Sequence, residues 1–212
     1  YGLDMVSQLS RALADEGYAV WNLEYRGSGG GWPHTFLDMA HGLDYLRTIA
    51  ANHPLDLSRV VLVGHSAGGT LVCWAAARSR LPSTSDLYTS DPLPVRHIVC
   101  LAGIVDLRHA EQLGACGDDL PSTLGGKSDE VPEHYQHASP MELLPIGVPQ
   151  THIVGEGEPG LLAHVQTYLN AARSAGDAVT LTTIPDCGHY EVVVPGTVAW
   201  PVVRDAVRNA LQ

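Results

Sequence analysis

Hydrophobic residues along the chain form two kinds of segment that alternate with each other. In one kind, apolar residues recur every three or four positions, which predicts helices at residues 2–17, 36–51, 71–78, 161–175 and 197–211. In the other, apolar and β-branched residues run together, which predicts strands at residues 18–25, 60–63, 97–103, 151–156 and 179–185. This alternation is typical of an α/β fold with a doubly wound, mostly parallel sheet and helices on both faces.

The length of 212 residues fits one domain, so we expect a single domain over residues 1–212. Residues 104–148 show weak periodicity and many turn residues. We therefore expect this segment to form a cap or excursion across the carboxyl ends of the strands, where the functional loops of such folds gather.

The strand at residues 60–63 leads into Gly64-His65-Ser66-Ala67-Gly68, which fits the pattern G-x-S-x-G, and a predicted helix follows. This combination is typical of a nucleophile elbow, a strained turn that exposes a serine hydroxyl at the end of a strand. We expect the two glycines to prevent collisions with the neighbouring strand and helix. The alternative is a glycine-rich turn whose serine only caps the helix. The flanking strand and helix favour the elbow, with Ser66 as the candidate nucleophile.

A serine hydroxyl becomes a good nucleophile when a base accepts its proton and an acid orients that base. In α/β-hydrolases, the serine, the acid and the histidine follow one another along the chain, each after a strand. His189 directly follows the last predicted strand and is the candidate base. Glu158 follows the preceding strand and is the candidate acid. Glu156 and Asp106 are alternatives, although Asp106 is also placed to cap a helix.

The backbone N–H of Ala67, the residue after the serine, is the candidate oxyanion donor. A second donor usually comes from a His-Gly-Gly segment, which the sequence lacks. His65 and Trp32 are candidate substrate-pocket residues, and Trp32 follows the glycines of a loop at residues 26–33. Trp32 is equally placed to anchor that loop in the core.

The composition narrows the range of partners. A formal charge of −11 disfavours nucleic acid and anionic membranes, and no run of 18 apolar residues predicts a membrane span. The candidate serine, histidine and acid predict a small-molecule ester or amide substrate as the partner. The sequence does not decide whether the chain also forms a homodimer. The cysteines lack the spacing of a disulfide framework or a metal site, which favours a cytoplasmic location; they are Cys73, Cys100, Cys116 and Cys187.

The sequence also offers candidate ligands for a zinc site. His134 and His137 have helical spacing and follow Cys116, but no further residue completes a convincing ligand set. The sequence therefore predicts no metal site.

Several segments together carry a resemblance to a known family; they are Glu24-Tyr25-Arg26, Gly29-Gly30-Gly31-Trp32-Pro33, Gly64-His65-Ser66-Ala67-Gly68-Gly69, Ser139-Pro140, Leu143-Leu144-Pro145 and His189. They resemble the α/β-hydrolase superfamily, and within it the kynurenine formamidase and carboxylesterase-like branch. That branch is also similar to feruloyl esterase-like and hormone-sensitive-lipase-like enzymes. Gly155-Glu156-Gly157-Glu158 aligns with a Gly-x-x-Asp segment of the branch, so that Glu158 stands where the family has its acidic residue.

The resemblance implies a serine hydrolase of small carboxylic esters or N-formyl aryl amides, which works through an acyl-serine intermediate without metal or organic cofactor. Family members carry strands and an oxyanion loop before the point where Tyr1 falls, so we expect an N-terminally incomplete chain. Two alternatives are a non-catalytic binding module with the same fold and a serine peptidase.

Overall fold

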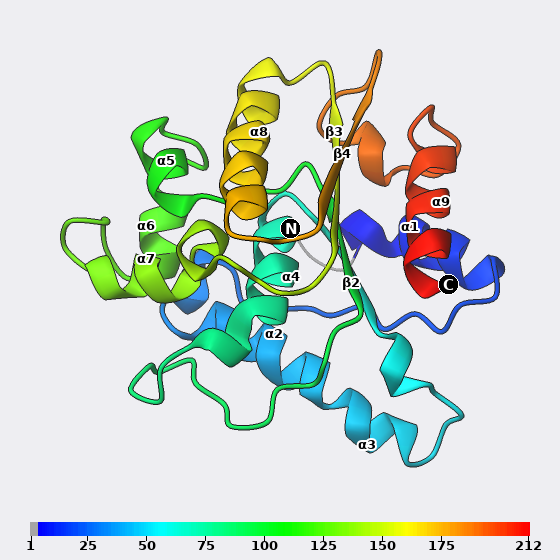
Figure 1. Cartoon of the computed structure of the whole chain (residues 1–212), viewed down its shortest axis with the longest axis horizontal. Coiled ribbons are helices and arrows are strands. Elements are labelled where there is room, and N and C mark those ends of the chain that lie inside the picture. Colours follow the sequence, from blue (N-terminus) through cyan, green and yellow to red (C-terminus); the bar gives the residue numbers. More distant parts are fainter. Residues whose placement is uncertain (1–3) are drawn as a thin grey trace.

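A four-stranded parallel sheet forms the centre of the computed structural model, which describes residues 4–212 (Figure 1). The strands are β1 (Val61–His65), β2 (His97–Leu101), β3 (Gln150–Gly155) and β4 (Val179–Ile184). They lie side by side in chain order, with Val61 opposite His97, Ile98 opposite Gln150, and Gln150 opposite Val179. All four carboxyl ends therefore lie at the same edge of the sheet.

Helices cover both faces of the sheet (Figure 1). The helices are α1 (Asp4–Asp15), α2 (His34–Asp44), α3 (Leu46–Ala50), α4 (Ala67–Ala77), α5 (Leu107–Gln112), α6 (Asp119–Leu124), α7 (Pro132–Ala138), α8 (Pro159–Ser174) and α9 (Trp200–Leu211). Because the strands follow one another in one direction, right-handed crossovers place α4 and α8 on the same face. The hydrophobic core on that face is separate from a second core, to which α1 and α9 contribute on the opposite face.

The places of the strands and helices in the layers explain the pattern of apolar residues in the sequence. The side chains of β2 from Ile98 to Leu101 are fully buried on both faces, which explains why alternation is lost there. Helix α4 packs between the sheet and α2, so nearly all of its side chains are apolar. Helices α1 and α9 bury only one stripe, which includes Leu9 and Val203. The α/β-hydrolase fold class predicted from the sequence is confirmed.

The predicted strand at residues 18–25 is wrong. The segment has no regular secondary structure, and Trp21 and Leu23 contact α2 instead of extending the sheet. Trp21 donates its indole N–H to the carbonyl of Gly42 at 3.0 Å, and Leu23 lies so close that a Cβ on Gly42 would approach it to 2.7 Å. A strand needs a neighbouring strand to pair with as well as apolar residues. The pattern of apolar residues does not show whether such a partner is present.

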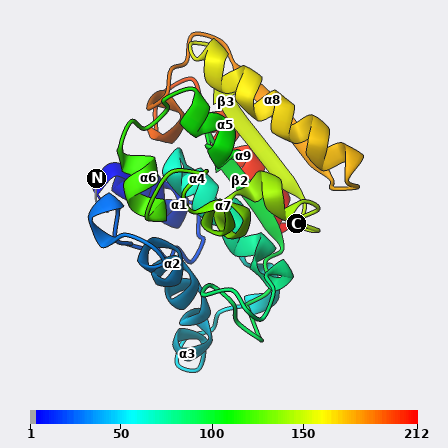
Figure 2. The ribbon, with the colours of Figure 1, turned by 90° about the vertical axis from the view of Figure 1, so that its left-hand side faces the viewer.

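The structure also changes one predicted helix and shows the secondary structure of residues 104–148. The predicted helix at residues 36–51 begins at His34 and is divided into α2 and α3 at Tyr45. Residues 104–148 form α5, α6, α7 and a short 3₁₀ turn at Pro140–Leu143. Figure 2 shows α5, α6 and α7 grouped in front of α4, while α8 runs along β3. Within residues 4–212, no helix combines the length and the apolar character needed to cross a membrane.

Candidate active site

Ser66 occupies the turn between β1 and α4. β1 ends at His65 and α4 begins at Ala67, and Ser66 adopts φ 54° and ψ −118°, a backbone conformation that is strained for a residue with a side chain. The Ser66 N–H donates to the Leu101 carbonyl at 2.9 Å, and its own carbonyl accepts from Gly69 N–H at 2.9 Å. These bonds hold the turn at the carboxyl end of the sheet, as a nucleophile elbow requires.

Close packing at the elbow depends on Gly64 and Gly69. A Cβ on Gly64 would lie 2.2 Å from the Gly68 carbonyl oxygen, and one on Gly69 would lie 2.6 Å from Cα of Gly103. By contrast, the atom nearest to a Cβ on Gly68 is the Tyr25 hydroxyl at 3.8 Å, an ordinary contact. The expectation that both glycines of the G-x-S-x-G pattern prevent collisions is therefore wrong for Gly68.

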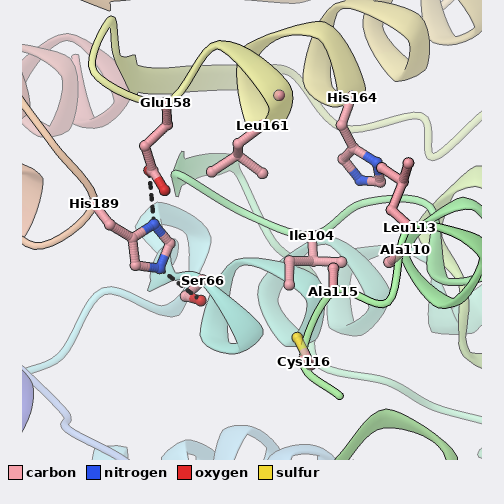
Figure 3. Close-up of a pocket in the computed structure, with 11 residues that line it drawn as sticks. Ser66, Ile104, Ala110, Leu113, Ala115, Cys116, Glu158, Leu161, His164 and His189 are labelled. Carbon is pink, nitrogen blue, oxygen red and sulfur yellow. Dashed lines mark hydrogen bonds and ion pairs between the residues drawn. The ribbon is translucent and has the colours of Figure 1, made fainter.

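Ser66, His189 and Glu158 form one hydrogen-bonded line (Figure 3). Ser66 Oγ donates to His189 Nε2 at 3.0 Å, and His189 Nδ1 donates to Glu158 Oε2 at 2.8 Å. The carboxylate accepts the Nδ1 proton, which leaves the lone pair of Nε2 facing the serine. The structure thus brings together the three side chains that the sequence places after β1, β3 and β4.

The loops after β3 and β4 meet because glycines let their backbones approach. A Cβ on Gly155 would lie 2.1 Å from the Cys187 carbonyl oxygen, and the Gly157 N–H donates to the same oxygen at 3.0 Å. This contact holds Glu158 and His189 at bonding distance, with about a quarter of each side chain exposed.

The two alternative acids are engaged elsewhere. Glu156 accepts a hydrogen bond from the Thr183 hydroxyl at 2.9 Å. Asp106 accepts from the His109 N–H at 3.1 Å and caps α5. Glu158 is therefore the carboxylate that the geometry pairs with His189.

Ala67 is the first residue of α4, and the first N–H groups of a helix have no acceptor within the helix. Its N–H therefore lies next to Ser66 at the positive end of the helix dipole, where it can bind a developing oxyanion. We assign no second donor within residues 4–212.

His65 holds the backbone of the histidine loop. Its Nε2 donates to the His189 carbonyl at 2.8 Å, and the two imidazole rings lie 4.6 Å apart. Burial lowers the pKa of His65 to about 4, so the ring is neutral at pH 7 and carries the proton that the carbonyl accepts. His65 is therefore a residue that positions the loop carrying His189.

A cavity of about 280 Å³ opens beside Ser66. Its apolar lining comes from the segment after β2 and from α8; it consists of Ile104, Ala110, Leu113, Ala115 and Leu161. In Figure 3, Leu161 and Ile104 lie between the Ser66–His189–Glu158 line and His164 at the far side. The predicted pocket residues His65 and Trp32 do not line this cavity. Trp32 instead stacks on His134 at 4.2 Å, which anchors the glycine-rich loop.

The sequence reasoning missed His164. Its Nε2 accepts the N–H groups of Val105 and Asp106 at 3.1 and 3.2 Å, and its Nδ1 lies 3.1 Å from His109 Nδ1. Burial lowers the pKa of His164, in keeping with a ring nitrogen that accepts two hydrogen bonds. The sequence contains one signal that could have indicated it. Leu161 and His164 are three residues apart, which places both on one face of the predicted helix.

The candidate zinc ligands of the sequence do not form a site. His134 Nδ1 lies 2.6 Å from the Leu124 carbonyl, and its ring stacks on Trp32. Within the described part of the chain, the group of three side chains that could hold a metal ion is a different one, away from the serine.

A strained serine between a strand and a helix, hydrogen-bonded to a histidine and a carboxylate at the ends of neighbouring parallel strands, defines an α/β-hydrolase. Within that class, the chain belongs to the BD-FAE family, whose family model matches residues 2–166. No curated protein matches the sequence.

Several solved structures share the fold. Esterase B from Lactobacillus rhamnosis is 18% identical with a TM-score of 0.80, over 95% of this chain and 68% of that one. A truncated carbohydrate esterase from gut microbiota is 21% identical with a TM-score of 0.73, over 89% of this chain and 73% of that one. A bacterial heroin esterase is 22% identical with a TM-score of 0.69, over 90% and 64% of the two chains.

Proposed function

We propose that the protein is a serine esterase that cleaves small carboxylic esters through an acyl-serine intermediate. The observation that carries the proposal is the continuous line from Ser66 Oγ through the His189 ring to the Glu158 carboxylate, with bonds of 3.0 and 2.8 Å. Membership of the BD-FAE family and the fold shared with several esterases support it.

The geometry suggests a role for each group. Ser66 Oγ attacks the ester carbonyl carbon while its proton passes to His189 Nε2. Glu158 stabilises the imidazolium that forms, and the Ala67 N–H binds the carbonyl oxygen as it becomes negative. His189 then gives the proton to the leaving alcohol. A water molecule, deprotonated by the same histidine, releases the acid and restores Ser66.

The cavity supports a substrate with a small apolar group beside the scissile carbonyl. Its volume of about 280 Å³ lies just below the usual range for small-molecule sites, and its lining is largely apolar. One structural relative, esterase B, has been solved inhibited by a tributyrin phosphonate, which has short acyl chains. We infer that esters of short acids are better substrates than long-chain esters. N-formyl aryl amides, suggested by the resemblance to kynurenine formamidases, would use the same residues and form the second candidate class.

Kinetics with paired variants test this assignment. Glu158→Gln leaves a hydrogen-bonding side chain but favours the wrong imidazole tautomer, so we expect kcat for p-nitrophenyl butyrate to fall by about 10,000-fold. The matched control, Glu156→Gln, changes a carboxylate that contacts Thr183 instead of His189, and we expect it to keep kcat within about two-fold.

Two outcomes would revise the proposal. If Glu156→Gln, and not Glu158→Gln, abolishes turnover, the acid has been assigned to the wrong residue. If N-formylkynurenine has a higher kcat/KM than p-nitrophenyl acetate, butyrate and octanoate, the enzyme is a formamidase that uses the same three residues.

A further inference from the structure

Three side chains that the proposed reaction does not use come together beneath the elbow. Cys73 comes from α4, Cys100 from β2 and His152 from β3, and all three are fully buried. Their sulfur atoms and an imidazole nitrogen lie within 4.8 Å of one another. The group lies directly behind the nucleophile turn, since a Cβ on Gly69, in the first turn of α4, would lie 3.0 Å from Cys100 Sγ.

The imidazole of His152 is held with one lone pair unused. Its Nε2 donates to Gln150 Oε1 at 3.0 Å, so Nδ1 carries no proton. The lone pair of Nδ1 can therefore accept a hydrogen bond or bind a metal ion. This Nδ1 is buried and makes no hydrogen bond of ordinary geometry among residues 4–212, and the neighbouring Cys100 thiol interacts with the same ring. Buried polar atoms without a partner are rare, because leaving one unpaired typically costs about 1–3 kcal/mol.

An outer set of hydrogen bonds fixes this orientation of His152. Gln150 Oε1 also accepts from the Tyr168 hydroxyl at 2.9 Å, and Gln150 Nε2 donates to Asp177 at 3.5 Å. Asp177 in turn accepts two backbone N–H groups at 2.7 Å. Metal-binding histidines usually donate their other ring N–H to such a buried acceptor, which sets the tautomer.

We propose that Cys73, Cys100 and His152 bind a zinc ion through their two sulfurs and Nδ1, with one water molecule enclosed during folding as the fourth ligand. Thiolates and imidazole are ligands that zinc prefers, and two thiolates balance its charge, so the buried complex is neutral. The two thiol protons leave to solvent when zinc binds. Two sulfurs on a tetrahedral zinc lie about 3.8 Å apart. The two sulfurs, which lie within 4.8 Å of each other, therefore have to approach by about 1 Å at most.

The ion would have a structural role. It would tie α4, which begins one residue after Ser66, to β2 and β3 behind the turn. Because the ligands come from three separate elements, the unfolded chain holds no preformed site, and binding stabilises the folded state. Zinc would be taken up as the chain folds, since the site is closed to solvent.

The test is refolding of the full chain with and without zinc chloride, followed by removal of free metal. We expect one bound zinc ion per chain by elemental analysis and a higher Tm than for the metal-free protein. Refolding with cobalt(II) instead should produce the thiolate-to-cobalt charge-transfer absorption that reports sulfur ligands directly. Ser66→Ala should bind zinc like the wild type, which separates this result from the esterase proposal.

Matched variants make the test specific. Cys73→Ala should lose the metal and the cobalt absorption, whereas Cys187→Ala, which removes a buried cysteine outside the group, should keep both. Gln150→Met removes the outer hydrogen bond and should weaken zinc affinity by about 10- to 100-fold. Three results would overturn the proposal: a folded wild-type chain without bound zinc, retention of zinc by Cys73→Ala, or a Cys73–Cys100 disulfide in the purified protein.

Discussion

At the scale of single residues, the site depends on which nitrogen of each histidine carries a proton. His189 donates from Nδ1 to Glu158 and presents Nε2 to the serine. His65 does the reverse and donates from Nε2 to the His189 carbonyl. The second contact fixes the backbone of the residue that makes the first. Both rings must be neutral for this arrangement, because a protonated imidazole cannot accept the serine proton and a charged His65 would be costly to bury.

His65 should make stability depend on pH. Burial lowers its pKa from 6.5 to about 4, so between these values the unfolded chain binds a proton that the folded chain does not. The contribution of His65 to the free energy of unfolding should therefore be complete above pH 6.5, and should be lost as the pH drops from 6.5 through about 4.

The matched variant for this prediction is His65→Gln, which keeps an N–H donor but does not titrate. Urea unfolding at pH 7 and at pH 4 should show a smaller loss of unfolding free energy for the variant than for the wild type. An equal loss in the two proteins would mean that His65 is not the group whose protonation destabilises the fold.

At the scale of elements, the site is made by three strand ends and by the closeness of the segments that follow them. The turn after β1 is tight because Gly64 has no side chain to meet the Gly68 carbonyl. The loops after β3 and β4 touch because Gly155 leaves room for the Cys187 carbonyl. The triad is therefore positioned by backbone contacts, while the cavity depends on side chains of α8 and of the segment from β2 to α6.

The two glycines of the elbow should respond differently to substitution. Gly64→Ala places a methyl group 2.2 Å from a backbone oxygen, so the helix must move, and we expect a loss of about 1–3 kcal/mol in unfolding free energy or more. Gly68→Ala meets its nearest neighbour at 3.8 Å and adds a better helix former. Its unfolding free energy should stay unchanged or rise by up to about 1 kcal/mol. Urea denaturation measures both, and equal losses would contradict this account of the turn.

At the scale of the whole molecule, the sequence predicts the layered fold well because each buried parallel strand leaves a run of apolar residues. The segment at residues 18–25 has the same kind of run but forms no strand. Two of its side chains, Trp21 and Leu23, contact α2 instead, and a local sequence pattern does not predict that contact. Ser66, Glu158 and His189 could be placed because each directly follows a strand, and parallel strands bring these positions to one edge.

The cavity and the buried thiol group could not be predicted in the same way. Leu113 and Leu161 become neighbours in one cavity only through the packing of α8 beside the segment after α5. Cys73, Cys100 and His152 are far apart in the chain, and metal motifs are recognised by short spacings. Such sites depend on three-dimensional packing that a single sequence does not display.

The central claim is that Ser66 is an activated nucleophile, and burst titration with p-nitrophenyl acetate tests it most directly. We predict a rapid release of nitrophenol stoichiometric with enzyme, accompanied by an acetyl group on Ser66 in the intact-mass and peptide spectra, and the loss of both in Ser66→Ala. A folded wild-type chain that gives no burst and no acetylated serine would contradict the account. It would favour a binding module that has the fold of an enzyme without its chemistry.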